Sequence, residues 1–239
     1  MVESDVTPSA NRGKLINLRR LGVLALAVIG ALALLATGRE QASATSYCPA
    51  RAALPARVVI DRPQVLFSAP IVTSCNNYTI AAYLYGAGGS LDYLWWDATK
   101  SSNTVQFNTL VQAPGSYRTR LDSGYSDGFV NGVAWTPTSV TLKYASYDYV
   151  ASTRVGKVVY INGLLRSYSN GFRPIVAGTG RVQYLQRYVR GGWQTVLART
   201  ANSAGRFAVG FIQPNVFQYR LVSLDTPTAW GAISASTVR

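Results

Sequence analysis

The chain has 239 residues, and its 23 Lys or Arg against 10 Asp or Glu give a formal net charge of +13. It contains no histidine and only two cysteines. These counts exclude a Ser/His/Asp or Cys/His nucleophile relay, a His-ligated metal, and a cysteine-rich metal site within one chain. We therefore expect no cofactor and no resident metal.

The first 44 residues have the pattern of an export signal. Four basic residues precede position 21, an uncharged apolar run covers residues 21–37, and Ala42-Ser43-Ala44 supplies small residues for cleavage. We predict a signal peptide over residues 1–44 and a secreted or cell-surface protein. The alternative is an uncleaved signal anchor, because 17 apolar residues are near the lower limit for crossing a bilayer. Such an anchor would be the chain's only contact with a membrane.

The basic charge remains after residues 1–44 are removed. The rest of the chain has 18 basic and 7 acidic residues, a net charge of +11, and all seven acids are Asp. The arginines are dispersed along the chain, and no nucleic-acid-binding motif accompanies them. We therefore expect no nucleic acid as a partner, and the expected partner is an unknown protein or a cell-wall polymer. The positive charge of the chain would attract an anionic polymer of this kind.

The two cysteines form the simplest pair. Cys48 and Cys75 are 27 residues apart in a chain expected to be exported, so a disulfide is predicted. Closing such a loop stabilises a fold by about 3 to 4 kcal/mol on the chain-entropy model. A redox-active pair is the alternative, which the missing Cys-x-x-Cys motif disfavours.

From residue 53 onward the chain is typical of an all-β protein. Short β-branched and aromatic runs are bounded by Gly, Pro, Asn, Asp and Ser. The dipeptides Asn131-Gly132 and Asn162-Gly163 predict tight hairpins, because type I′ turns need positive φ at both central residues; Asn170-Gly171 predicts a further turn. The expected strands cover residues 58–60, 78–85, 91–96, 104–111, 116–121, 140–144, 181–188, 194–198, 206–212 and 217–222.

A weak internal repeat divides these strands into two halves. Val105 and Phe107 precede a proline and then Tyr117-Arg118, and Phe207, Val209 and Phe211 precede a proline and then Tyr219-Arg220 about a hundred residues later. This period predicts two tandem immunoglobulin-like antiparallel β-sandwiches, at residues 45–145 and 146–239. Tyr117 and Tyr219 stand where a tyrosine corner would place its hydroxyl against nearby backbone.

The second half also resembles a known family. Gly163-Leu164-Leu165, Val182-Gln183-Tyr184-Leu185-Gln186-Arg187, Gly191-Gly192-Trp193, Gly205-Arg206-Phe207 and Tyr219-Arg220 are similar to motifs in immunoglobulin-like modules of exported actinobacterial proteins. The resemblance covers about residues 154–239, and the first half shares only the sandwich plan. It implies a noncatalytic accessory or spacer module with Trp193 and Phe207 in the core and Gly192 and Gly205 in turns.

Three aromatic residues are the best candidates for a binding site. Tyr93, Trp95 and Trp96 lie between Asp92 and Asp97 in a predicted strand. Alternation places Tyr93 and Trp95 on one face and Trp96 on the other. Exposed rings here would stack on sugars, whereas the alternative reading makes Trp95 or Trp96 the core tryptophan of a sandwich.

Acidic residues give little support for catalysis. Asp92 and Asp97 are five residues apart and fall on opposite faces of an extended strand, which excludes a glycosidase pair unless the strand bends. Asp122 and Asp127 bracket a Gly-containing segment that suggests a calcium loop, but the EF-hand pattern is absent and a solvated turn is favoured.

We therefore predict that the chain is not an enzyme. It is expected to be a secreted or cell-surface structural or interaction protein of two immunoglobulin-like modules. The alternative is a secreted cell-wall glycan or carbohydrate-binding module that uses Tyr93, Trp95 or Trp96 with nearby arginines.

Overall fold

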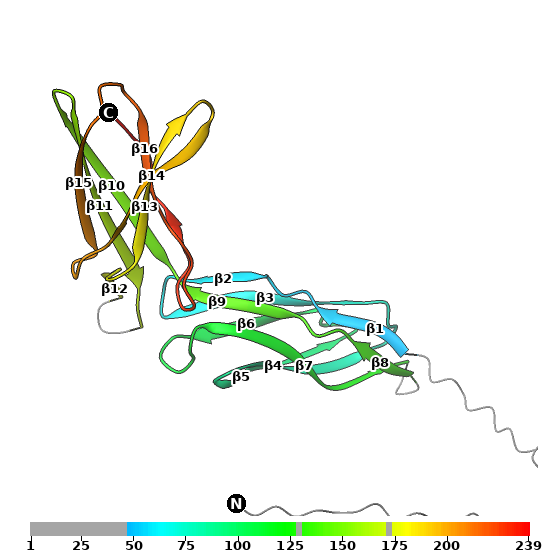
Figure 1. The fold of residues 1–239 in the computed structure, drawn as a ribbon. Coiled ribbons are helices and arrows are strands. Elements are labelled where there is room, and N and C mark those ends of the chain that lie inside the picture. The colour runs from blue at the N-terminus through cyan, green and yellow to red at the C-terminus, as the bar shows by residue number, and fades with distance from the viewer. Residues whose placement is uncertain (1–46, 128–130, 171–173) are drawn as a thin grey trace, which may run out of the picture. The chain divides into compact units, whose positions relative to one another are not determined.

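The computed structural model describes residues 47–127, 131–170 and 174–239, so the predicted signal peptide and Gly171 of the third Asn-Gly pair lie outside the described residues. Every regular element within these ranges is a β-strand, which confirms the all-β prediction (Figure 1). No helix that is long and apolar enough to cross a membrane occurs in this part of the chain.

The first nine strands pair among themselves in one sheet system. Strand β7 lies at its centre and pairs with β4, β8 and β9, while β1 connects β8 to β3 and β3 pairs with β6. Most neighbours are antiparallel, but β1 runs parallel to β8 and β2 runs parallel to β9. The strands are β1 (Tyr47–Ala52), β2 (Arg57–Ile60), β3 (Gln64–Thr73), β4 (Thr79–Gly86), β5 (Gly89–Asp97), β6 (Ser102–Asn108), β7 (Gly115–Ser126), β8 (Asn131–Trp135) and β9 (Ser139–Tyr144).

Apolar side chains alternate along these strands, so one face of each strand is buried in a common core. Trp96 and Phe107 are the largest apolar side chains there that are fully buried, and the Trp96 indole donates a hydrogen bond of 2.8 Å to the Ala69 carbonyl of β3. The Tyr117 hydroxyl donates to the Ala113 carbonyl at 2.6 Å. This bond confirms the tyrosine corner predicted at Tyr117.

The predicted disulfide is confirmed. Cys48 on β1 is bonded to Cys75, just after β3, with their Cα atoms 5.3 Å apart. Thr73 supports the link, because its hydroxyl donates to the Pro49 carbonyl and accepts from the Cys75 backbone N–H. The bond therefore ties the beginning of the described chain to the end of the long strand β3.

The remaining nine strands form two further sheets. In one, β11 pairs with β10, β12 and β15; in the other, β13 pairs with β14 and β16, and β16 also pairs with β17 and β18. All of these pairs are antiparallel. The strands are β10 (Ser146–Val155), β11 (Val158–Tyr168), β12 (Ile175–Ala177), β13 (Val182–Val189), β14 (Gly192–Thr200), β15 (Arg206–Ile212), β16 (Gln218–Ser223), β17 (Ala232–Ile233) and β18 (Thr237–Val238).

These two sheets enclose a second, smaller core. Its buried apolar members are Val159, Ile161, Leu185, Phe207, Tyr219 and Leu221. Phe207 is therefore in the core as expected, but the core position expected for Trp193 is wrong. Trp193 is half-buried on β14, where its ring packs against Tyr188 and beneath the guanidinium of Arg220, 4.2 Å from the ring centroid.

The two predicted Asn-Gly hairpins are also wrong. Asn131-Gly132 begins β8, and Asn162-Gly163 lies in the middle of β11. Gly163 serves packing instead of a turn, because a Cβ at this position would collide with the Phe207 ring. The actual hairpin turns use other glycines: Gly156 between β10 and β11, and Gly191 between β13 and β14, both with positive φ.

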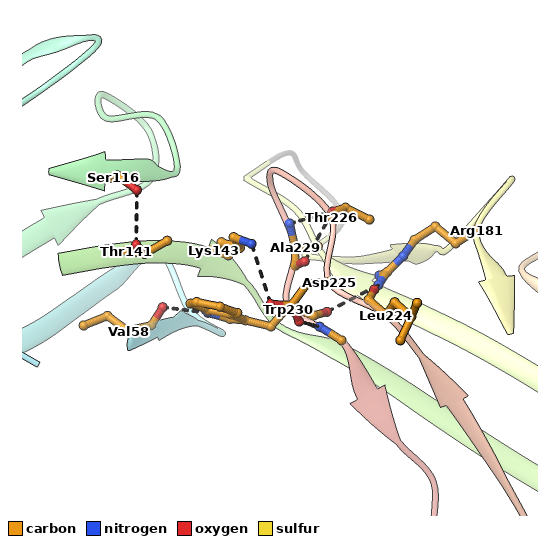
Figure 2. Close-up of polar contacts among 11 residues, drawn as sticks. Val58, Ser116, Thr141, Lys143, Arg181, Leu224, Asp225, Thr226, Ala229 and Trp230 are labelled. Carbon is orange, nitrogen blue, oxygen red and sulfur yellow. Dashed lines mark hydrogen bonds and ion pairs between the residues drawn. The ribbon is translucent and has the colours of Figure 1, made fainter. Parts of the chain in front are cut away.

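A loop between β16 and β17 reaches strands β2 and β9 (Figure 2). Its Trp230 is buried and donates an indole hydrogen bond of 2.9 Å to the Val58 carbonyl. The ring lies between two cations, with the Arg57 guanidinium carbon 4.0 Å and the Lys143 Nζ 4.6 Å from its centroid. Lys143 also lies 3.7 Å from a carboxylate oxygen of Asp225 in the same loop. The β16–β17 loop is thus in direct contact with strands β2 and β9.

Candidate functional site

The structure separates the three predicted site residues. Tyr93 and Trp95 on β5 expose 46% and 51% of their surface, whereas Trp96 exposes none. This confirms the predicted alternation and removes Trp96 from the candidate site, because a wholly buried indole cannot contact a ligand at the surface. Trp96 is the core tryptophan that the alternative reading required.

Two neighbouring strands extend the exposed surface around Tyr93. Strand β4 lies between β5 and β7, and the register places Tyr83 opposite both Tyr93 and Arg120 (Figure 1). One step along the strands, Tyr85 lies opposite Arg118. We call this solvent-facing surface the aromatic face, and it comprises Tyr83, Tyr85, Tyr93, Trp95, Arg118 and Arg120.

Contacts within the aromatic face hold its rings in place. The Tyr83 and Tyr93 rings have centroids 5.0 Å apart and are tilted by 56°. The Tyr93 hydroxyl donates to a carboxylate oxygen of Asp122 at 3.1 Å. Desolvation, followed by this bond to Asp122, raises the pKa of Tyr93, so the phenol stays protonated and remains a donor at neutral pH. The Arg120 guanidinium carbon lies 5.9 Å from the Tyr85 centroid.

A hollow of about 470 Å³ adjoins the aromatic face. Its lining includes Tyr85, Arg118 and Arg120 from the face and Trp135 and Pro137 from beyond β7. It opens along the edge of β7 opposite to β4, between the pairing of that edge with β9 at residues 115–118 and its pairing with β8 at residues 125–126. Two arginines therefore lie where a flat aromatic surface meets a depression.

This arrangement suits recognition of a flat, hydroxyl-rich ligand. The electron-rich faces of aromatic rings attract polarised C–H groups such as those on a sugar ring, while phenol hydroxyls remain available for hydrogen bonds. Arginine adds several donors in a fixed plane and binds carboxylate or phosphate in a bidentate manner. The aromatic face therefore combines the group types that bind a glycan.

Each acidic candidate has its own separate contacts. An oxygen of Asp97 accepts hydrogen bonds from the Thr99 hydroxyl, the Thr99 backbone N–H and the Lys100 backbone N–H, which lowers its pKa and fixes the turn after β5. Asp92 is half-buried, and desolvation raises its pKa. Asp122 contacts Tyr93 on the aromatic face. Within the described residues, no group of three or more acidic, Cys or His side chains could hold a metal ion.

Four members of the aromatic face were not predicted from the sequence: Tyr83, Tyr85, Arg118 and Arg120. All four belong to predicted strands, and alternation alone could have shown which residues of each strand share a face. Their meeting depends on β4 pairing with both β5 and β7. It also depends on register irregularities at Leu84/Tyr85 and Ala81/Ala82, which alternation does not reveal.

No protein-family model matches the chain, and no curated protein matches it. Distant likenesses exist among solved structures. The chain is similar to bovine butyrophilin with 10% identity and a TM-score of 0.41, covering 79% of this chain and 98% of that one. It is similar to the human OSCAR ligand-binding domain with 14% identity and a TM-score of 0.28, covering 81% and 100%.

A third likeness is to a tetra-tandem repeat from the extending region of a large adhesion protein. The identity is 12% and the TM-score is 0.31, with coverage of 80% of this chain and 49% of that one. The chain thus spans about half of that structure, and it spans 29% of a biofilm-associated BSP domain that it also matches. None of these likenesses identifies a ligand for this chain, so its function is argued from its own residues.

Proposed function

We propose that the chain is a noncatalytic, secreted or cell-surface interaction protein of two immunoglobulin-like modules, at residues 45–145 and 146–239, and that its aromatic face binds glycan. The observation that carries the glycan assignment is the exposure of Tyr93 and Trp95 on the same sheet face as Arg118 and Arg120. This combines the function predicted from the sequence with its alternative.

The strand pairing of β1–β9 supports an immunoglobulin-like module. An immunoglobulin-type sandwich has one sheet of strands A, B and E and a second of strands G, F and C. Strands β1, β3 and β6 pair in the first manner, and β9, β7, β4 and β5 in the second. Tyr117 near the start of β7 bonds back to Ala113, at the corner where such domains carry their tyrosine.

Strands β10–β18 follow a similar plan. Strands β10, β11 and β15 correspond to A, B and E, and β14, β13 and β16 to the opposing sheet. Tyr219 near the start of β16 corresponds in position to Tyr117 of β7, but its hydroxyl has no hydrogen-bond partner in the described chain, so the tyrosine corner predicted at Tyr219 is wrong. This correspondence supports the repeat predicted from the sequence and the resemblance of residues 154–239 to modules of exported actinobacterial proteins.

The disulfide supports a location outside the cytoplasm, because such bonds persist in oxidising compartments. The arginines support a surface protein more than a nucleic-acid binder. Several have internal partners, since Arg154 and Arg181 donate to backbone carbonyls and Arg57 packs on Trp230. The positive charge is therefore only partly available for an anionic polymer. The proposed partner is a protein or a cell-wall polymer.

The test is retention of the purified chain on insoluble cell-wall fractions and immobilised glycans, at low and high salt. We expect Trp95→Ala and Tyr93→Ala to reduce retention about tenfold each, because aromatic anchors dominate such interfaces. Trp193→Ala is the matched control, since this tryptophan lies on β14 and should leave retention unchanged.

The proposal for the aromatic face would be contradicted if the wild type were not retained, or if Trp95→Ala were retained as well as the wild type. It would also be contradicted if high salt abolished the retention of the wild type and of Trp95→Ala to the same extent. The last would assign the binding to net charge.

A further inference from the structure

The solvent face of β10, β11 and β15 contains a row of short side chains between two rows that each carry a tyrosine. The register places Ala151 opposite Asn162, and Asn162 opposite Ala208. Two residues away on one side, Tyr149, Leu164 and Arg206 form the next row; on the other side the row is Thr153, Tyr160 and Gly210. The short row therefore forms the floor of a depression that crosses the strands, which we call the cross-strand trough.

The trough is a real hollow. One hollow of about 510 Å³ is lined by Tyr149, Ala151, Asn162, Arg206 and Ala208, among others. A second of about 390 Å³ adjoins it, sharing Asn162 and Ala208 and extending to Tyr160 and Gly210. Together they run over the middle of a sheet face whose floor has no bulky apolar side chain.

Tyrosine rings wall the trough on both sides. Tyr149 exposes 54% and Tyr160 exposes 44% of its surface. The Tyr160 ring lies over Gly210, because a Cβ built at residue 210 would be only 2.9 Å from its Cε1 atom. The glycine thus allows the ring to rest against the sheet beside the floor instead of standing away from it.

Four polar side chains of the trough have no hydrogen-bond partner within the described chain. The side chains of Asn162, Arg206, Tyr149 and Tyr160 make no hydrogen bond to any other residue in the part of the chain that the structure describes. Asn202 fixes the start of β15, since its side-chain oxygen accepts from the backbone N–H groups of Ala204 and Arg206. None of the residues that line the two hollows is acidic, so Arg206 is not neutralised there.

We propose that the cross-strand trough is a binding site for an acidic sugar residue of a glycan. The two wall rows are four residues apart along the strands, about 13 Å between Cα atoms, and the three strands span about 10 Å. Between the side chains this leaves room for a sugar ring lying on the alanine floor, flanked by tyrosines. Asn162 would bond its hydroxyl groups, and Arg206 would bind its carboxylate in a bidentate manner.

A sugar fits the trough better than a peptide does. Peptides that add to a sheet pair with the backbone of an edge strand, but the trough runs across three strands and offers only side chains. Peptides held by side-chain anchors need apolar pockets, and the floor here is Ala, Asn and Ala. The trough shares no residue with the aromatic face, so this inference stands or fails independently of the proposed function.

The test is titration of the full chain with tetragalacturonate, and with its methyl ester as a neutral control, followed by calorimetry or NMR. We expect the acid to bind and the ester to bind about tenfold more weakly. Ala208→Trp fills the trough without changing charge, and Arg206→Gln removes the carboxylate partner, so each should weaken acid binding about tenfold. Arg199→Gln, an exposed arginine of β14, is the charge-matched control and should leave it unchanged.

Several results would overturn the trough assignment. If Ala208→Trp bound tetragalacturonate as tightly as the wild type, the sugar would lie elsewhere. If Arg206→Gln and Arg199→Gln lost affinity equally, the binding would depend on net charge alone. Absence of binding to tetragalacturonate would also overturn it, as would equal affinity for tetraglutamate, which would indicate an acidic peptide. Trp95→Ala should leave the trough intact, so a loss of tetragalacturonate affinity in that variant alone would assign the uronate to the aromatic face.

Discussion

The two strand groups follow a similar pairing plan but fill their interiors differently. The core of β1–β9 is built around Trp96 and Phe107 and is tied by a disulfide. The core of β10–β18 has six buried apolar residues. It also encloses Asp148 and Gln183, whose side chains are buried and joined by a hydrogen bond of 2.6 Å.

The difference extends to unsatisfied polar atoms. Buried side-chain atoms without a hydrogen-bond partner in the described chain occur mainly in the second group, where they belong to Asp148, Arg154, Gln183, Arg187 and Tyr219. In the first group they belong to Thr109 and Trp135. Because each such atom loses water without compensation, we expect the second group to be the less stable of the two. A similar pairing plan thus leaves stability to the choice of core residues.

The largest expected effect tests the stability of the first group. Trp96→Ala should lower the free energy of unfolding by about 3 to 5 kcal/mol, because it leaves a large cavity and an unpaired Ala69 carbonyl. Urea denaturation followed by circular dichroism measures the change. If the first group is the more stable one, this substitution should reverse the order in which the two groups unfold.

Trp95→Ala is the matched control for this prediction. Its indole is half-exposed and outside the core, so the free energy of unfolding should fall by about 1 kcal/mol or less. Equal losses in the two variants would contradict the placement of Trp96 as the core tryptophan.

The sequence was sufficient for most strands and for the disulfide, because these depend on local alternation and on the only possible cysteine pair. It was insufficient for β1, β3, β10 and the short strands β12, β17 and β18. Strand β3 contains Pro70, which normally argues against a strand interior. Pro70 is tolerated because it is the residue where β3 changes partner from β6 to β1. That change is a long-range event with no local signal.

The glycines show the same limit. Asn162-Gly163 has the composition of a hairpin turn, yet Gly163 is used to admit the ring of Phe207 from β15. The aromatic face and the cross-strand trough likewise depend on residues that distant strands bring together. Sequence patterns could indicate which side of a strand faces solvent, but not which strand lies next to it.

A smaller effect on stability is expected from removing the hydroxyl groups of Tyr117 and Tyr219. Tyr117→Phe should lower the free energy of unfolding by about 1 kcal/mol, because it removes the hydrogen bond to the Ala113 carbonyl. Tyr219→Phe should be neutral or stabilising by up to about 1 kcal/mol, because the hydroxyl it removes is buried and has no partner in the described chain. Denaturation of both variants under one set of conditions measures the contrast, and similar losses would refute it.

The smallest effect concerns the pH dependence of the second group. Desolvation raises the pKa of Asp148, and the neighbouring Ser223 and Gln183 oppose the shift only in part. The folded state therefore binds a proton more readily than the unfolded state. The contribution of the Asp148 carboxyl to the free energy of unfolding should rise as the pH falls from neutral through the folded-state pKa. It should level off near the pKa of an unfolded aspartate, about 3.9.

Asp148→Asn removes this titration and should raise the free energy of unfolding at pH 7 by about 1 kcal/mol or less. Asp97 provides the opposite sign, because hydrogen bonds from Thr99 and Lys100 lower its pKa. Asp97→Asn should therefore have a lower free energy of unfolding than the wild type at pH 7. It should also lose less of that free energy than the wild type does when the pH falls. Thermal unfolding between pH 3 and 7 measures both slopes. If Asp148→Asn instead reduced the loss of stability on acidification, as Asp97→Asn should, the buried carboxyl would have to be stabilised as an anion, and the polar interior of the second group would not be its weak point.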